Sequence, residues 1–325
     1  MRVIRCLVVA VVATGCGSRA ADTAPAGRLS SPPAAPYLMF LSVASDDSFH
    51  HVSLASLASL NNAFVTPLTC ERVYFSADRG ICLNSEAQGT ATAWFADVFD
   101  GSFQRLFRLP LVGTPSRVRL SPDGRRAAAT MFETGHAYDE HGFSTRTTII
   151  DTQTGKSPGD LEQFAVFRDG KRINAEDFNF WGATFANDND TFYATLQTAS
   201  VSYLIKGSVE RRTVDVLRPG VECPSLSPDN RRIAFKKRIG TQSRGWWQIA
   251  VLPLDTLADT LVATETRSVD DQVEWIDADR VAYHLTGGST AADLWAVRVD
   301  GSAPPELLRA ASYSPAVVRQ TIRSK

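Results

Sequence analysis

The chain has 325 residues, of which 44% are hydrophobic and 21% charged, so it is long enough to bury a sizeable core and too apolar to be a disordered chain. Its formal net charge at pH 7 is −1, whereas a protein that binds nucleic acid carries a basic surplus to neutralise the phosphate backbone. We therefore expect no nucleic-acid partner.

The first residues have the pattern of an export signal. The stretch "MRVIRCLVVAVVATGCGS" has two arginines followed by an apolar run that is too short to span a bilayer but typical of a signal-peptide core. The run ends in "ATGC", which resembles the lipobox of bacterial lipoproteins, where the cysteine becomes lipid-modified. We expect residues 1–15 to be a lipoprotein-type signal peptide and Cys16 to anchor an exported protein to the cell membrane. Ordinary signal-peptidase cleavage is the alternative, and it gives a soluble secreted or periplasmic protein.

Residues 16–35 are rich in alanine, proline, serine and glycine and contain almost no large apolar side chain. Such a segment cannot bury enough surface to offset its ordering entropy, so we predict a flexible tether. We expect the folded domain to span residues 36–319, with residues 320–325 as a C-terminal tail.

Cys70 and Cys82 lie on either side of the turn "SADRG". If the flanking runs pair as a hairpin, the two thiols lie nearly opposite each other, and an oxidising compartment favours a disulfide between them. Two buried reduced cysteines are the alternative, because a disulfide requires a narrow range of geometries. Cys223 has no evident partner, so we expect a buried, inert thiol.

A turn motif recurs along the chain. The stretch "LSPDGRR" occupies residues 120–126 and "LSPDNRR" occupies residues 226–232, and the full set of turns lies at Ala77, Pro122, Asn187, Pro228, Ile276 and Pro315. In the best copies proline presets φ, Asp or Ser bonds to the backbone, and Gly or Asn takes a positive φ. A repeat of mostly about forty to fifty residues built of short strands is typical of a β-propeller, in which each unit is a four-stranded blade.

Five full units cover residues 70–311, each with four short strand-like runs and no helical period. One strand remains at the C-terminal end and about three remain near the N-terminal end, and together they complete a sixth blade. The predicted fold is therefore all-β: a six-bladed β-propeller of four-stranded antiparallel blades, with the ring closed by N- and C-terminal strands.

The stretches "LSPDGRR", "LSPDNRR" and "DLWAVRVDG", the last at residues 293–301, resemble the WD40-like (PD40) repeat of the TolB-like six-bladed β-propeller family, here in an exported bacterial lipoprotein form. The resemblance covers about residues 37–318. It implies a propeller fold and, for function, an exported protein that binds a partner.

Propeller topology places the S-P-D-G hairpins on one rim, which we call the hairpin rim, and the more variable loops on the opposite loop rim. We expect function on the loop rim, where two long loops at residues 132–144 and 159–179 also fall. Residues that come just before the inner strands should gather there as a candidate ligand-binding rim: Glu71, Arg117, Asp177, Glu222, Asp270 and Asp271. These acids predict a channel mouth suited to a cation or a basic peptide. Alternatively, they satisfy backbone N–H groups where strands begin.

We expect Lys236, Lys237 and Arg238 to be a solvated strand end.

Imidazole and carboxylate ligands for zinc or a similar ion are available at His136, Asp139, Glu140 and His141 in the first long loop. Their spacing matches no strict motif, so ordinary polar loop residues are the alternative. We expect no cofactor. A bound cation is the one exception, and it would lie in this loop or at the acidic mouth of the channel.

No nucleophile elbow, zinc-protease helix or phosphate-binding glycine loop occurs in the sequence. We therefore predict a monomeric, non-catalytic binding or scaffold protein that recognises a protein, peptide or glycan partner at the cell envelope. The alternative is a propeller hydrolase, directed at glycosides or peptides, that uses carboxylates of the channel.

Overall fold

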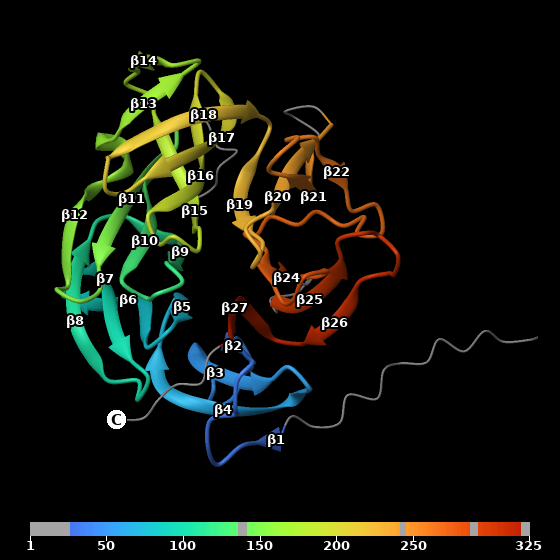
Figure 1. The fold of residues 1–325 in the computed structure, drawn as a ribbon. Helices are drawn as coiled ribbons and strands as arrows, with labels where there is room; N and C mark the ends of the chain where they lie inside the picture. The colour runs from blue at the N-terminus through green and yellow to red at the C-terminus, as the bar shows by residue number, and fades with distance from the viewer. Residues whose placement is uncertain (1–26, 136–141, 241–244, 287–291, 320–325) are drawn as a thin grey trace, which may run out of the picture.

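The computed structural model describes residues 27–135, 142–240, 245–286 and 292–319, and these residues form six β-sheets arranged as blades around a central axis (Figure 1). In blades one, two, four and five, four antiparallel strands follow one another in chain order across the sheet.

Blade one consists of β5 (Arg72–Ser76), β6 (Arg79–Gln88), β7 (Ala91–Asp100) and β8 (Arg105–Leu111). Blade two consists of β9 (Thr114–Leu120), β10 (Arg126–Thr134), β11 (Ser144–Asp151) and β12 (Lys156–Asp160). Blade four consists of β19 (Glu222–Leu226), β20 (Arg232–Ile239), β21 (Trp246–Pro253) and β22 (Thr260–Leu261). Blade five consists of β23 (Glu274–Trp275), β24 (Arg280–Thr286), β25 (Ala292–Arg298) and β26 (Glu306–Arg309).

Blade six is built from both ends of the chain. Its innermost strand is β27 (Ser312–Val318), which pairs antiparallel with β2 (Tyr37–Ser42), and β3 (His51–Ser56) and β4 (Ser59–Thr69) follow outward. The short strand β1 (Gly27–Arg28) adds to the outer edge of β4 in parallel. The structure therefore confirms the predicted fold class, six blades with a ring closed by N- and C-terminal strands.

Blade three is wider than the others. Its regular strands are β15 (Asn179–Phe185), β16 (Thr191–Thr198), β17 (Val201–Ser208) and β18 (Thr213–Pro219). Beyond β18 the sheet continues with β13 (Ala165–Arg168), which runs parallel to β18, and β14 (Lys171–Ile173). A short 3-10 helix, η1 (Leu161–Gln163), leads into β13. The expectation of one long loop at residues 159–179 is therefore wrong, because residues 165–173 form two strands and their turn at the outer edge of blade three.

The recurring turns are held by their own side chains. In blade two Ser121 Oγ lies 2.6 Å from the Asp123 carboxylate and accepts the Arg126 N–H at 3.0 Å, and Gly124 has a φ of +73°. Blade four repeats this arrangement, with a φ of +59° at Asn230. Glycine and asparagine adopt this conformation more readily than most residues, which explains why the best copies of the motif have Gly or Asn there.

Apolar side chains are buried mainly between successive blades. For example, Ile81 and Val98 of blade one pack against Val118 and Leu120 of blade two, and comparable clusters lie at the other junctions around the ring. Since each blade buries one face against the next, no blade holds a complete core by itself, and the closing blade supports the whole ring.

Cys70 and Cys82 are joined by a disulfide with a Cα–Cα distance of 5.5 Å, and Cys223 is a buried free thiol. Across the residues that the structure describes, no helix is long and apolar enough to cross a membrane.

Candidate functional site

The loop rim holds a network of paired charges. Lys236 on β20 has a fully buried side chain, and its ammonium group contacts the Asp270 carboxylate directly and lies 3.8 Å from the Glu222 carboxylate. The Arg117 guanidinium donates to the Asp270 backbone carbonyl at 3.4 Å. The expectation that Lys236 is solvated is therefore wrong, because this lysine is the buried cation that the rim acids surround.

Burial raises the pKa of Glu222, and the Lys236 ammonium works in the opposite direction. Burial also acts against ionisation of Asp270, but Lys236 and Arg117 hold the pKa of Asp270 below its ordinary value. The mouth is therefore a compensated cluster of acids and bases, and its net field is weaker than the acids alone would produce.

Asp271 is bound to a different partner. Its carboxylate lies 2.7 Å from His284 Nδ1 and accepts the His284 backbone N–H at 3.1 Å. Burial opposes ionisation of Asp271, yet His284 and Arg117 bring its pKa below the ordinary range. Glu71 lies 3.6 Å from His50 Nδ1, and the neighbouring Arg72 donates to the Ser116 carbonyl at 2.7 Å.

Asp177 does not join this cluster through any contact of the described residues. Its carboxylate accepts a hydrogen bond from the Thr198 hydroxyl and another from the Ala199 N–H, each at 2.6 Å, and both lower the pKa of Asp177. These bonds hold the turn after β16, so Asp177 acts locally within blade three.

The candidate metal ligands His136, Asp139, Glu140 and His141 lie outside the described residues. The described part of their loop is shorter than the sequence suggested, because β10 and β11 stay paired as far as Thr134 and Ser144. Within the described ranges, no group of three or more His, Cys, Asp or Glu side chains is placed to hold a metal ion.

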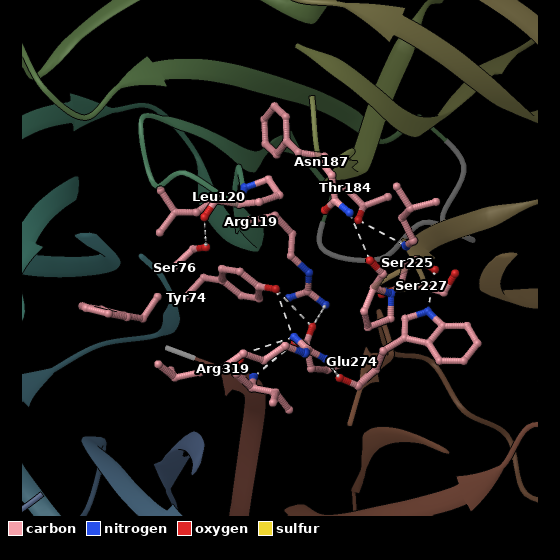
Figure 2. Close-up of a pocket in the computed structure, with 18 of the residues that line it drawn as sticks. Tyr74, Ser76, Arg119, Leu120, Thr184, Asn187, Ser225, Ser227, Glu274 and Arg319 are labelled. Atoms are coloured by element: carbon pink, nitrogen blue, oxygen red, sulfur yellow. Dashed lines mark hydrogen bonds and ion pairs between the residues drawn. The ribbon is translucent and has the colours of Figure 1, made fainter. Parts of the chain in front are cut away.

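A cavity of about 200 Å³ opens on the channel at the hairpin rim, which is the opposite end from the one the sequence favoured. We call it the channel pocket (Figure 2). All six inner strands contribute to it. Its lining includes Tyr74, Arg119, Thr184, Ser225, Glu274 and Val317, one residue from each inner strand.

Arg119 and Glu274 form the charged centre of the channel pocket (Figure 2). The Arg119 guanidinium donates to the Val273 carbonyl at 3.2 Å, lies 3.4 Å from the Glu274 carboxylate, and has its Cζ 4.7 Å from the centre of the Tyr74 ring. Glu274 also accepts hydrogen bonds from the Tyr74 hydroxyl at 3.3 Å and the Val317 N–H at 3.1 Å. Arg119 therefore links blade two to blade five across the axis.

The walls of the channel pocket combine apolar and polar groups. Phe75, Leu120, Phe185 and Leu226 contribute apolar surface, and Asn187 at the mouth donates to the Pro228 carbonyl at 3.1 Å. Because these groups are fixed by their own bonds, the pocket presents a pre-formed mixed surface that can receive a partner's side chains without rearranging.

Sequence reasoning missed these residues. One signal was available in the sequence. In blades one to five, the residue just before the last large apolar residue of the inner strand lines the pocket. These residues are Tyr74, Arg119, Thr184, Ser225 and Glu274. The surrounding turn is repeated, but this position carries a different side chain in every blade.

The architecture defines a six-bladed β-propeller with a pocket at one end of its channel. No family model matches the sequence, and no curated protein matches it. Among solved structures, TolB from Acinetobacter baumannii is similar with a TM-score of 0.58 at 15% identity, covering 87% of this chain and 66% of that one. A nidogen/laminin complex is similar with a TM-score of 0.55 at 9% identity, covering 86% of this chain and 97% of that one.

A puromycin-hydrolysing peptidase from Mycobacterium tuberculosis is also similar, with a TM-score of 0.53 at 12% identity, covering 86% of this chain and 44% of that one. This chain therefore spans about two thirds of the Acinetobacter TolB structure and less than half of the peptidase. In fold, the chain is a TolB-like β-propeller. At these identities the likeness concerns the fold alone.

Proposed function

We propose that this protein is a non-catalytic binding propeller of the cell envelope, and that it recognises a peptide segment or protein loop at the channel pocket. The observation that carries the proposal is the pocket itself, where six inner strands place six different side chains around one opening. A repeat architecture supplies the scaffold, and differences at one equivalent position supply the recognition surface.

The size of the channel pocket favours a macromolecular partner. A volume of about 200 Å³ is smaller than the roughly 300–1,000 Å³ of ordinary small-molecule sites. It suits one or two side chains of a partner whose remaining surface rests on the hairpin rim. Arg119, Glu274 and Asn187 then supply polar contacts, and Phe75 and Leu120 supply apolar contacts.

The loop-rim residues have a structural part in this proposal. Glu222, Asp270 and Asp271 already hold Lys236 and His284, so an incoming cation has to displace a bonded partner. Such a displacement costs the energy of the existing pair, and the same holds for Arg119 and Glu274 at the channel pocket. The two ends differ in space, because the cavity beside Arg117, Asp271 and His284 has about 20 Å³ and the channel pocket about 200 Å³. We therefore place recognition at the opposite end of the channel, where a partner's side chain has room.

A single carboxylate favours binding over glycoside cleavage. Hydrolysis of a glycoside ordinarily uses two carboxyl groups on either side of the bond. In the described residues that line the channel pocket, Glu274 is the one acid, and its oxygens accept bonds from Tyr74 and Val317. The alternative enzyme predicts turnover of chromogenic glycosides or peptides that disappears in Glu274→Gln, whereas the binding protein gives no turnover before or after this change.

Export and lipid anchoring at Cys16 belong to the same proposal. The first described strand, β1, lies on the outer edge of blade six, so a lipid on Cys16 would hold the propeller from that edge. The ten residues between Cys16 and Gly27 reach at most roughly 35 Å. Mass spectrometry of the membrane fraction should find a diacylglyceryl group on Cys16, and a protein that stays soluble after correct export contradicts the anchor.

Recognition is tested by obstructing the channel pocket. A photo-crosslinking residue at Asn187 should capture a specific partner in living cells, and Asn187→Trp should prevent copurification of that partner. The matched control is Leu106→Trp on β8, because Leu106 is also exposed but lies on an outer strand of blade one. Equal loss of the partner in both variants, or no effect of either, contradicts recognition at the channel pocket.

A further inference from the structure

A second cavity, of about 460 Å³, lies between blades two and three, away from the channel. We call it the interblade cleft, and its lining is Arg125, Arg126, Ile149, Asp151, Gln153, Pro158, Phe164, Val209, Glu210 and Arg212. We propose that the interblade cleft binds a uronic-acid saccharide, with the sugar carboxylate held between Arg125 and Arg212.

The insertion that widens blade three builds one wall of this cleft. Phe164 lies between η1 and β13, and the next residue, Ala165, donates its N–H to the Arg212 carbonyl at 3.0 Å. The Arg212 guanidinium lies over the Phe164 ring with 5.0 Å from Cζ to the ring centre. Within the described ranges, no other blade carries a strand pair of this kind beyond its outer strand, so this wall belongs to the junction of blades two and three.

Among the described contacts, two guanidinium groups at the cleft have few carboxylates close to them. Arg212 hydrogen bonds to neutral oxygens, those of the Pro158 carbonyl and the Gln163 amide. Arg125 has an exposed side chain and, among the described residues, one ion pair, at 3.8 Å from Asp123. Arg126 differs, because it pairs with both Asp190 at 3.2 Å and Glu210 at 3.0 Å. Arg125 and Arg212 are therefore the groups available to an anion.

The remaining lining indicates what else the ligand carries. Ile149, Phe164 and Val209 are buried and contribute the apolar part of the cleft. The Asp151 and Glu210 carboxylates lie in the same lining, and they repel a polyanion but accept hydrogen bonds from hydroxyl groups. One carboxylate, several hydroxyls and an apolar ring face together describe a uronic-acid sugar. The volume falls within the roughly 300–1,000 Å³ range of small-molecule sites.

The test is calorimetry of the full-length protein with galacturonate, its neutral methyl ester and a short acidic peptide. Galacturonate should bind saturably below about 1 mM, at least about tenfold more tightly than the ester. Arg125→Ala should weaken binding about tenfold, and Arg212→Ala should do the same. Arg231→Ala is the matched control for Arg125, since it holds the equivalent place in the blade-four turn, and Arg211→Ala is the control for Arg212.

Because Arg125 is exposed, its replacement leaves the fold intact, and its result stands even if Arg212→Ala unfolds the protein. Unchanged affinity in Arg125→Ala overturns the proposal, as does equal binding of the ester. Binding of the peptide but not of the sugar overturns the saccharide assignment, and absence of sugar binding up to millimolar concentration overturns the site. None of these results depends on the channel pocket.

Discussion

Replacing Lys236 by methionine tests the charge network of the loop rim. The Lys236 side chain is fully buried, and the change leaves two carboxylates without their cation. Glu222 remains buried with a side chain that is 11% exposed, whereas Asp270 is 54% exposed and regains water. Breaking a fully buried pair costs about 3–5 kcal/mol, so we expect a loss of about 2–4 kcal/mol after allowing for the exposure of Asp270.

The loss should depend on pH through Glu222. Burial raises the pKa of folded Glu222 above its unfolded value, so its contribution to stability is fully present at low pH and is lost as pH rises through the folded pKa. Without Lys236 the folded pKa of Glu222 rises further. The difference between Lys236→Met and the wild type should therefore be small near pH 4.5 and grow toward pH 8.

Urea unfolding followed by tryptophan fluorescence at pH 5 and pH 8 measures this effect. The double variant Lys236→Met/Glu222→Gln should recover at least half of the loss at pH 8, because it removes the uncompensated carboxylate. Lys237→Met is the control: Lys237 is 32% exposed and pairs with Asp259, so its loss should stay below about 1 kcal/mol. A deficit below about 1 kcal/mol in Lys236→Met, or one that neither pH nor Glu222→Gln changes, refutes the reasoning.

Three more predictions concern the ring. Deleting residues 313–325 removes nearly all of β27, the inner strand of blade six, and should abolish the cooperative thermal transition; a sharp transition in the shortened protein contradicts ring closure. Arg232→Ala should cost about 1 kcal/mol in urea unfolding, because Arg232 donates to the Ala278 carbonyl of blade five, while Arg231→Ala should change stability by less than about 0.5 kcal/mol; equal effects contradict this role. Replacing Cys70 and Cys82 together by serine should cost about 3 kcal/mol, and a reductant should destabilise the wild type but not this variant.

The blades could be predicted from the sequence because the forces that shape their turns are local. Ser121, Asp123 and Gly124 fold their own hairpin through bonds that span only a few residues, and Ser227, Asp229 and Asn230 do the same in blade four. A local signal that recurs at regular spacing reveals a repeat, and a repeat of short strands reveals a propeller. Ring closure could be predicted because one C-terminal strand and about three N-terminal strands were left over after five full blades, and together they complete a sixth.

The extra strands of blade three could not be predicted in the same way. β13 pairs in parallel with β18, so Val166 lies beside Val214, which is 48 residues later in the chain. Locally, the segment shows a turn at Asp169 and Gly170 between short charged runs, which is also what a loop shows. Whether this segment forms strands or a loop depends on the edge of β18, which is distant in sequence and open to pairing. No residue near the segment encodes that edge.

The charge network of the loop rim and the channel pocket could not be predicted either, because each joins residues that are far apart in the sequence. Lys236 occurs in a run of three basic residues, and its ammonium group pairs with Asp270, which lies far along the chain and which no local pattern connects to it. The channel pocket likewise brings together single residues from six blades, so no short motif describes it. In this propeller a repeated turn joins the two inner strands of a blade, and the side chain just inside that turn differs from blade to blade. Arg119 and Ser225 differ at this position although the turns that follow them, at residues 121–124 and 227–230, are held by the same bonds, which is why we seek recognition at the channel pocket.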